Sequence, residues 1–204
     1  MIKEHKGLFI SVEGPNGSGK STFIKSLSNK LSQRYRVYQT CEPSHSALGN
    51  YARYNEANLN GLPYAYLICA NRCEHIEQEV IPHLQHGDIV ISDRYIDSCM
   101  VYQKYEGVSY EQIWELNHNF LIPDLNILLT ADKTHLEERL TRRDRLTRYE
   151  KAMSREQELQ LYLNARNFLE SKGFHYLSCC NNTLEDLEIN VNQAYNKISI
   201  LCGE

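Results

Sequence analysis

Short apolar runs alternate with longer stretches of helical periodicity along almost the whole chain. The apolar runs are rich in β-prone side chains and predict strands, whereas apolar residues spaced three and four apart between them predict amphipathic helices. The predicted strands are Leu8–Val12, Arg36–Thr40, Ile89–Ser92, Leu125–Thr130 and His175–Ser178. The predicted helices are Lys20–Ser32, Ser46–Asn55, Pro63–His86, Ile96–Tyr105, Ser109–Phe120, Lys133–Arg142, Ser154–Ser171 and Thr183–Ile198.

This alternation of strand and helix predicts an α/β fold with three layers, in which helices cover both faces of a five-stranded parallel sheet. Glycines at 87 and 173 stop helices just before strands, and Pro123 breaks the helix before the fourth strand. A chain of 204 residues suits a single domain, so we expect residues 1–204 to form one unit. Ligands of open α/β sheets lie beyond the carboxyl ends of the strands, and the residues that follow each strand are therefore the candidates for chemistry.

Composition narrows the class of protein. Apolar residues make up 42% of the chain and charged residues 24%, with a formal net charge of −4. This charge gives no general attraction to nucleic acid or to an anionic membrane. The seven cysteines include no C-x-x-C pair, which favours reduced thiols over a disulfide framework or a zinc site. The polar N-terminus and the absence of a long apolar run predict a soluble, cytoplasmic protein.

The segment that follows the first predicted strand reads G-P-N-G-S-G-K-S and fits the phosphate-binding loop pattern G-x-x-x-x-G-K-[ST]. Its glycines allow backbone N–H groups to surround phosphate oxygens at the start of the next helix. Lys20 can reach the β- and γ-phosphates of a nucleoside triphosphate, and the Ser21 hydroxyl can bind Mg²⁺. A chance glycine turn is the alternative, but the flanking strand and helix argue against it. The predicted triphosphate-binding residues are Gly14, Pro15, Asn16, Gly17, Ser18, Gly19, Lys20, Ser21 and Thr22.

The third predicted strand ends in Asp93-Arg94-Tyr95. Beside a phosphate-binding loop, an acidic residue at this place is a natural partner of the Mg²⁺ ion, so Asp93 joins Ser21 as a candidate metal residue. Arg94 can bind a phosphate through two N–H groups, and Tyr95 offers an aromatic face. A surface ion pair between Asp93 and Arg94 is the alternative.

Two further charged residues have two interpretations each. Glu42, followed by Pro43 after the second strand, either points toward the phosphate or caps a helix. Arg72 lies in an otherwise apolar helix, where an unpaired guanidinium would be costly. It either binds a ligand or pairs with Glu74 or Glu77 of the same helix.

A cluster of arginines follows the fourth strand, at positions 139, 142, 143, 145, 148 and 155. Such a run is often a solvated helix face, but the choice of arginine over lysine suits phosphate binding. We expect residues 139–155 to form a short helical lid that closes over the triphosphate and excludes water.

These motifs together resemble the thymidylate kinase family, and its bacterial members in particular. The resemblance spans about residues 7 to 170 and rests on motifs that occur in the family's order. They are Val12-Glu13-Gly14, Glu42-Pro43 with Leu48-Gly49, Ala70-Asn71-Arg72, Ser92-Asp93-Arg94-Tyr95-Ile96-Asp97-Ser98 with Tyr102-Gln103, Leu116-Asn117 with Pro123-Asp124-Leu125, and Arg148-Tyr149-Glu150.

The resemblance implies transfer of a phosphoryl group from ATP, with Mg²⁺, to dTMP, in an enzyme that usually forms homodimers and acts on a small nucleotide. Arg72 would bond O4 of the pyrimidine, Arg94 would hold the acceptor phosphate, Tyr102 would pack beside C2′ of the sugar, and Arg148 would contact the transferred phosphate. The expected catalytic residues are Lys20, Arg94 and Arg148. The expected acceptor-binding residues are Asn16, Glu42, Pro43, Ile68, Arg72, Arg94, Tyr95, Cys99, Tyr102 and Gln103.

Four positions depart from the family pattern. Asn16 replaces the acidic residue that contacts the sugar 3′-hydroxyl, and Ile68 replaces the phenylalanine on which thymine stacks. Cys41 and Thr147 replace an arginine before E-P and an aspartate of the lid. These changes affect the identity of the acceptor more than phosphoryl transfer itself. Two alternatives to a dTMP kinase therefore stay open: a kinase for another deoxynucleotide, a modified nucleotide or a nucleoside, and a non-catalytic protein that binds ATP.

Overall fold

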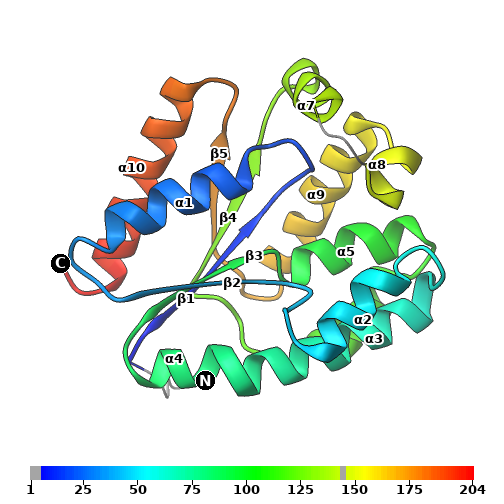
Figure 1. Ribbon diagram of the computed structural model, residues 1–204, viewed down its shortest axis with the longest axis horizontal. Helices are drawn as coiled ribbons and strands as arrows, with labels where there is room; N and C mark the ends of the chain where they lie inside the picture. The colour runs from blue at the N-terminus through cyan, green and yellow to red at the C-terminus, as the bar shows by residue number, and fades with distance from the viewer. Residues whose placement is uncertain (1–5, 143–145) are drawn as a thin grey trace.

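Five parallel strands form one sheet in the order β2-β3-β1-β4-β5. The structure, a computed structural model, describes residues 6–142 and 146–204. The strands are β1 Leu8–Glu13, β2 Val37–Cys41, β3 Ile89–Asp93, β4 Leu125–Thr130 and β5 Tyr176–Cys180. Each begins and ends within two residues of its predicted bounds. The predicted fold class, a parallel sheet between two layers of helices, is confirmed (Figure 1).

Alternate residues of the strands face two separate apolar cores. Ile10 and Ile91 face the layer formed by α1 (Lys20–Leu31) and α10 (Leu184–Leu201), which lie side by side on one face of the sheet (Figure 1). Phe9 and Val90 face the other core, which holds residues of α3, α5 and α9. Each central strand is therefore buried on both sides, as its continuous apolar sequence predicts.

The second layer begins with α2 (Ala47–Asn55), α3 (Gly61–His75), the π-helical segment η1 (Ile76–Val80) and α4 (Ile81–Gln85). It continues with α5 (Ile96–Tyr105), α6 (Tyr110–Asn117), α7 (Lys133–Thr141), α8 (Arg148–Ala152) and α9 (Arg155–Glu170). The helix predicted over Pro63–His86 is thus three consecutive segments. Proline at 82 has no N–H to donate within the helix, and the Ile81 N–H bonds to the carbonyl of Ile76.

Helix α8 lies within the expected helical lid but was not among the predicted helices, although its sequence carries a start signal. The Oγ1 of Thr147 accepts from the N–H of Glu150 at 3.2 Å, and the Glu150 carboxylate accepts from the N–H of Thr147 at 2.7 Å. This reciprocal arrangement is a capping box, which the sequence pattern Thr-x-x-Glu predicts. Arg143 and Arg145 of the predicted lid lie outside the described residues.

The carboxyl ends of β1, β2 and β3 meet at one edge of the sheet. In the strand register, Asp93 of β3 lies between Val12 of β1 and Cys41 of β2. The phosphate-binding loop leaves the sheet directly after Glu13, and Arg94 leaves directly after Asp93. Segments far apart in the sequence therefore deliver their polar residues to one place.

Candidate active site

The phosphate-binding loop joins β1 to α1 and depends on glycine at two positions. Gly14 has φ 141°, and a Cβ added there would lie 2.0 Å from the carbonyl oxygen of Leu129. Gly19 has φ 92°, in the left-handed region, and its Cβ would lie 2.5 Å from Nδ2 of Asn181. No other residue fits these positions without displacing the backbone or its neighbours. The loop is therefore built for close backbone approach, as its sequence predicted.

Lys20 lies at the start of α1 and folds back over the loop. Its Nζ donates to the carbonyl oxygens of Gly14 at 2.8 Å and Pro15 at 3.1 Å, and the residue is 7% exposed. Burial, and then the charge of Arg94, lower the pKa of Lys20 to about 7. An anionic phosphate would satisfy this ammonium group better than the two carbonyls do.

A cavity of about 370 Å³ opens beside the loop. Of the predicted triphosphate-binding residues, Asn16, Gly17, Gly19, Lys20, Ser21 and Thr22 line it, and Gly14, Pro15 and Ser18 do not. Asp93 also lines the cavity, and its buried Oδ1 has no hydrogen-bond partner among the described residues. Ser21 and Asp93, the two candidate metal residues, therefore share one polar cavity.

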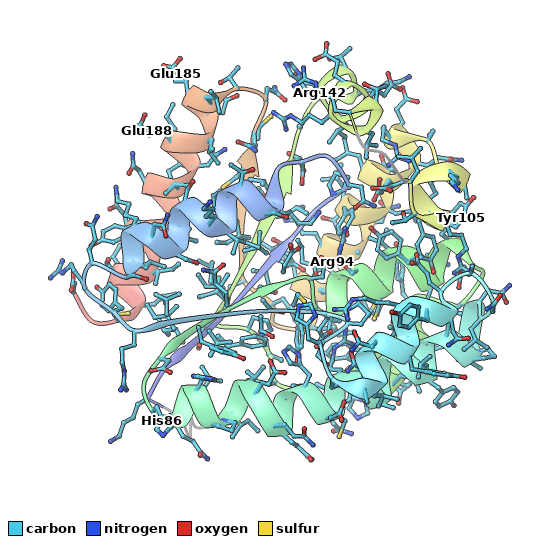
Figure 2. The ribbon with its side chains drawn as sticks, in the orientation of Figure 1. His86, Arg94, Tyr105, Arg142, Glu185 and Glu188 are labelled. Atoms are coloured by element: carbon cyan, nitrogen blue, oxygen red, sulfur yellow. The ribbon has the colours of Figure 1, made fainter. Side chains whose placement is uncertain are left out.

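Arg94 lies between the end of β3 and the start of α5, and its backbone conformation is strained. Its φ of 75° lies in the left-handed region, which a residue with a side chain rarely adopts. Its N–H donates to Val12 O at 3.0 Å, and Ser92 Oγ donates to Arg94 O at 2.7 Å. The side chain donates to Asn16 Oδ1 at 2.8 Å and to the Tyr162 hydroxyl at 2.7 Å, near the centre of the molecule (Figure 2). The alternative of a surface ion pair with Asp93 is wrong, because Arg94 points inward.

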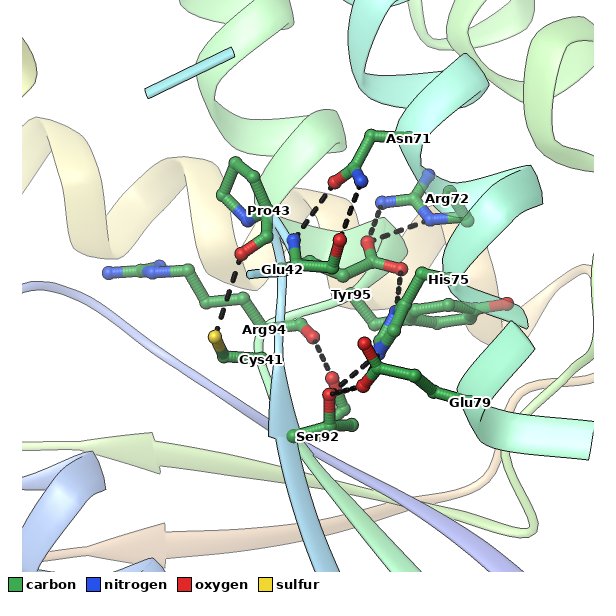
Figure 3. Close-up of polar contacts among 12 residues, drawn as sticks. Cys41, Glu42, Pro43, Asn71, Arg72, His75, Glu79, Ser92, Arg94 and Tyr95 are labelled. Carbon is green, nitrogen blue, oxygen red and sulfur yellow. Dashed lines mark hydrogen bonds and ion pairs between the residues drawn. The ribbon is translucent and has the colours of Figure 1, made fainter. Parts of the chain in front are cut away.

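Arg72 and Glu42 form a buried ion pair across two elements. Oε2 of Glu42 accepts from Nε of Arg72 at 2.9 Å and from Nη2 at 2.6 Å (Figure 3). Oε1 of Glu42 lies 3.2 Å from Nδ1 of His75, and Nη1 of Arg72 donates to Asn117. The guanidinium also lies 4.8 Å from the centre of the Tyr95 ring. The alternative in which Arg72 pairs with Glu74 or Glu77 is therefore wrong. The helix-cap interpretation of Glu42 is also wrong, since Ser46 caps α2.

A second cavity, of about 210 Å³, adjoins the first. It is lined by all the residues predicted to bind the acceptor: Asn16, Glu42, Pro43, Ile68, Arg72, Arg94, Tyr95, Cys99, Tyr102 and Gln103. Gln103 is 2% exposed, and its buried Oε1 has no hydrogen-bond partner among the described residues. Burial raises the pKa of Cys99 to about 12, so its thiol stays neutral at physiological pH. Arg53 and Arg94 line both cavities and make this end of the second cavity cationic, whereas Ile68, Arg72 and Cys99 line the second cavity alone and mark its other end.

Arg148 is placed differently from the expectation. It lines neither cavity, and its side chain bonds to Leu59 O, Glu106 and the Tyr149 hydroxyl. Of the other arginines in the run, Arg139 lines the first cavity and donates to Gly17 O at 3.1 Å, while Arg155 is buried against Glu158. The described part of this run is thus neither a plain solvated face nor a uniform phosphate clamp.

Two residues of the site, Arg53 and Glu158, had no role in the sequence prediction, and Arg139 had none of its own. Arg53 of α2 lines both cavities and donates to Ser44 O at 2.6 Å. Arg139 was only one of a run, and Glu158 of α9 bonds to Asn16 of the loop at 3.1 Å. Contacts with residues distant in the sequence place Arg139 and Glu158, whereas Arg53 bonds to the segment just before its own helix. An isolated arginine on an amphipathic helix, as at 53, carries no local signal of such a role.

Two cavities that meet at Asn16, Glu42, Arg53 and Arg94, one built on a phosphate-binding loop, define a P-loop kinase of nucleotides. The family model of thymidylate kinases matches residues 12–189. The chain is 40% identical over 149 residues to the probable thymidylate kinase of Caldivirga maquilingensis, covering 71% of this chain and 73% of that one. It is 39% identical over 145 residues to the probable thymidylate kinase of Pyrobaculum aerophilum, covering 70% and 74%. The chain belongs to the thymidylate kinase family, which confirms the resemblance.

The fold agrees with this assignment. The crystal structure of thymidylate kinase from Ehrlichia chaffeensis superposes with a TM-score of 0.72 at 23% identity, covering 94% of this chain and 98% of that one. Within the described residues, no helix is long and apolar enough to cross a membrane. Within the same residues, no group of three or more His, Cys, Asp or Glu side chains is placed to hold a metal ion.

Proposed function

We propose that the protein transfers the γ-phosphoryl group of ATP to dTMP, giving dTDP and ADP. The observation that carries this proposal is the junction of the two cavities at Asn16 and Arg94. A triphosphate in the first cavity and a monophosphate in the second would meet there, with their charges compensated by arginine and lysine. Catalysis then consists of positioning and charge stabilisation, since an acceptor phosphate oxygen is already ionised and needs no general base.

The first cavity supplies the donor site. Backbone N–H groups of the loop and the ammonium group of Lys20 would hold the β- and γ-phosphates. The residues present also fit a Mg²⁺ ion, because the Ser21 hydroxyl and the unpaired Oδ1 of Asp93 offer the oxygen ligands that this ion prefers. When bound, Mg²⁺ would neutralise charge on the β- and γ-phosphates. Arg139, which bonds to Gly17 O, holds the loop from the other side.

The second cavity supplies the acceptor site. Arg94 and Arg53 stand at its cationic end and would bind the 5′-phosphate, whereas Arg72 stands where a base carbonyl would accept from it. The ring of Tyr102 lies 5.5 Å from the guanidinium of Arg94 and would lie beside the sugar. Glu42 fixes the guanidinium of Arg72 and leaves it a donor in one orientation. A carbonyl at position 4 of the base, as in thymine, complements such a donor.

A second candidate is phosphorylation of another pyrimidine deoxynucleotide. Ile68 lines the base end of the cavity where an aromatic side chain would stack on thymine, and this change loosens the selection of the base. A non-catalytic ATP-binding role has less support, because Lys20, Ser21, Asp93 and Arg94 all face the cavities.

The proposed activity extends to the domain structure and the location of the protein. Residues 1–204 act as one P-loop kinase domain, with residues 139–155 as the lid, and the protein acts in the cytoplasm.

Exposed apolar side chains lie on the neighbouring helices α2 and α3, with Tyr54 84%, Tyr66 57% and Tyr51 56% exposed. Surfaces of this kind support association, so we infer a homodimer through these helices. Sedimentation of the wild type and of a Tyr54→Ser, Tyr66→Ser variant tests it: the variant should become monomeric.

The activity is tested by ADP release from ATP·Mg²⁺ with each nucleoside and each 5′-monophosphate as acceptor. We expect dTMP to give the highest kcat/KM. Preference for thymidine, dCMP or a purine nucleotide would leave the kinase class standing and overturn dTMP as the acceptor. ADP release without any acceptor, at the same rate, would point to an ATPase instead.

A further inference from the structure

A buried carboxylate on α9 connects the phosphate-binding loop with the acceptor cavity. Glu158 is 1% exposed. Its Oε1 accepts from the backbone N–H of Asn16 at 3.1 Å, from Nδ2 of Asn16 at 3.2 Å and from the Tyr102 hydroxyl at 3.1 Å. Its Oε2 accepts from Nη1 of Arg155 at 2.5 Å. Both oxygens therefore have partners. Oε1 bonds to residues of the site, and Oε2 bonds to Arg155, the first residue of α9.

This carboxylate determines which way the side-chain amide of Asn16 points. With Nδ2 directed at Glu158, Oδ1 faces Arg94 and accepts from its Nη2 at 2.8 Å. The reversed amide would place oxygen against the Glu158 carboxylate and nitrogen against the guanidinium, which opposes acceptor to acceptor and donor to donor. Asn16 therefore presents an acceptor oxygen where the two cavities meet.

The second contact of Glu158 acts on the same place. The hydroxyl proton of Tyr102 is directed to Oε1 of Glu158, and this oxygen also receives Nδ2 of Asn16. Asn16 and Tyr102 both line the acceptor cavity next to Arg94: Oδ1 of Asn16 accepts from Nη2 of Arg94 at 2.8 Å, and the centre of the Tyr102 ring lies 5.5 Å from the guanidinium. The sugar of a nucleoside monophosphate lies between its phosphate and its base, and so next to these two side chains.

We propose that Glu158 is a positioning residue for the sugar of the acceptor. Through Asn16 and Tyr102 it fixes the oxygen that accepts the hydrogen bond of the deoxyribose 3′-hydroxyl. The inference rests on the proposed function, because it places dTMP in the second cavity. It also places the carboxylate that bonds to Asn16 on α9 rather than in the loop, which has the neutral Asn16 here.

Arg155 connects the carboxylate of Glu158 to the end of α8. Nη2 of Arg155 donates to the carbonyl oxygens of Glu150 at 2.9 Å and Met153 at 2.6 Å, at the end of α8. The same guanidinium holds Oε2 of Glu158. The carboxylate is therefore held in place by α8 and α9, and it can orient the loop without moving itself.

Two single variants and their combination test the proposal. Glu158→Gln has one oxygen in place of two, so either Asn16 or Arg155 must face an NH₂ group. Asn16→Asp places a second carboxylate about 3 Å from Glu158, where two like charges repel. The double variant exchanges the carboxylate and the amide between the two positions. Glu156→Gln is the matched control, because Glu156 lies on the same helix in an exposed pair with Lys133.

The readout is kcat/KM for dTMP and for its 3′-deoxy analogue. We expect the wild type to favour dTMP over the analogue by about tenfold, and Glu158→Gln to lose most of this preference. Asn16→Asp should lower kcat/KM for dTMP by about a hundredfold, and the double variant should recover at least about tenfold of that loss. The control should match the wild type in both values.

Several results would overturn the proposal. One is an Asn16→Asp enzyme as active as the wild type, which decides the question even if Glu158→Gln does not fold. Another is a double variant as poor as the product of the two single effects. A third is a Glu158→Gln enzyme with an unchanged preference for the 3′-hydroxyl. A wild type that phosphorylates the 3′-deoxy analogue and dTMP equally also refutes it, without touching the proposed function, whereas failure to use dTMP at all refutes both.

Discussion

Nη2 of Arg72 lies 2.6 Å from Oε2 of Glu42, and the two side chains are only 1% and 4% exposed. The pair joins α3 to the exit of β2, and both side chains line the acceptor cavity. A buried ion pair contributes little net stability, but removing one partner leaves a charge without compensation. The pair therefore fixes the position of a donor and makes the fold depend on it.

Glu42→Gln should destabilise the protein by about 3–5 kcal/mol, because Arg72 would keep its charge in a buried place. Urea unfolding followed by circular dichroism measures this difference. The control is Glu156→Gln, which breaks the exposed pair with Lys133 and should cost less than about 1 kcal/mol. Equal effects of the two substitutions would mean that water screens Arg72 and that the pair does not hold it.

Lys20→Ala should lower kcat by several orders of magnitude while the protein stays folded. Lys20 would place charge on the γ-phosphate, and its Nζ bonds only to loop carbonyls, so it packs little of the core. Steady-state kinetics with ATP and dTMP, beside a thermal melt, separates the two effects. Turnover within about tenfold of the wild type would show that Lys20 is not the γ-phosphate ligand.

Binding of ATP should depend on pH through the same residue. The pKa of Lys20 is lowered to about 7 in the free protein, chiefly by burial and then by Arg94, so the amine loses its proton as the pH rises past neutrality. An anionic phosphate favours the ammonium form and raises this pKa, so binding takes up a proton above about pH 7.

The affinity for ATP should therefore fall between about pH 7.5 and pH 9, where the phosphates are already fully ionised, by up to about tenfold per pH unit. Titration calorimetry in buffers of different ionisation enthalpy counts the proton taken up. Lys20→Ala should bind more weakly and lose this pH dependence. A wild type without proton uptake in this range contradicts the lowered pKa.

The phosphate loop could be predicted from the sequence because its signal is local: glycines, a lysine and a serine within eight positions, between a strand and a helix. Glu42, Arg72 and Arg94 stood out as candidates from their place in the chain, but the full set of acceptor residues could be named only through the family motifs. The partners of Arg72 could not, because Glu42 and Asn117 lie 30 and 45 positions away and meet it only in the folded chain. The π-helical turn at Ile76–Val80 was missed because it continues the apolar pattern of the helices around it.

Arg148→Ala should lower kcat more than it raises KM for dTMP, if Arg148 leaves Glu106 to meet the transferred phosphate during the reaction. Its charge would then match the transition state better than the bound substrates. Glu106→Gln is the informative partner variant, because it removes the contact that holds Arg148 and leaves the arginine in place. Loss of stability in both variants without a change in kcat would assign Arg148 to the attachment of α8.

The base and the sugar of the acceptor should be selected by two side chains of the second cavity. Arg72, held by Glu42 and Asn117, offers N–H donors that suit O4 of thymine or uracil, whereas the exocyclic amine of cytosine would face it donor to donor. Tyr102, stacked on Tyr149 with ring centres 4.4 Å apart, cannot yield to a 2′-hydroxyl without separating the two rings. We therefore expect kcat/KM to decrease in the order dTMP, dUMP, then dCMP and the purine nucleotides, with the ribonucleotide below its deoxy form. Tyr102→Ala should narrow the gap between deoxyribose and ribose and leave the order of the bases unchanged. A change in base order without a change in sugar preference would mean that Tyr102 contacts the base instead.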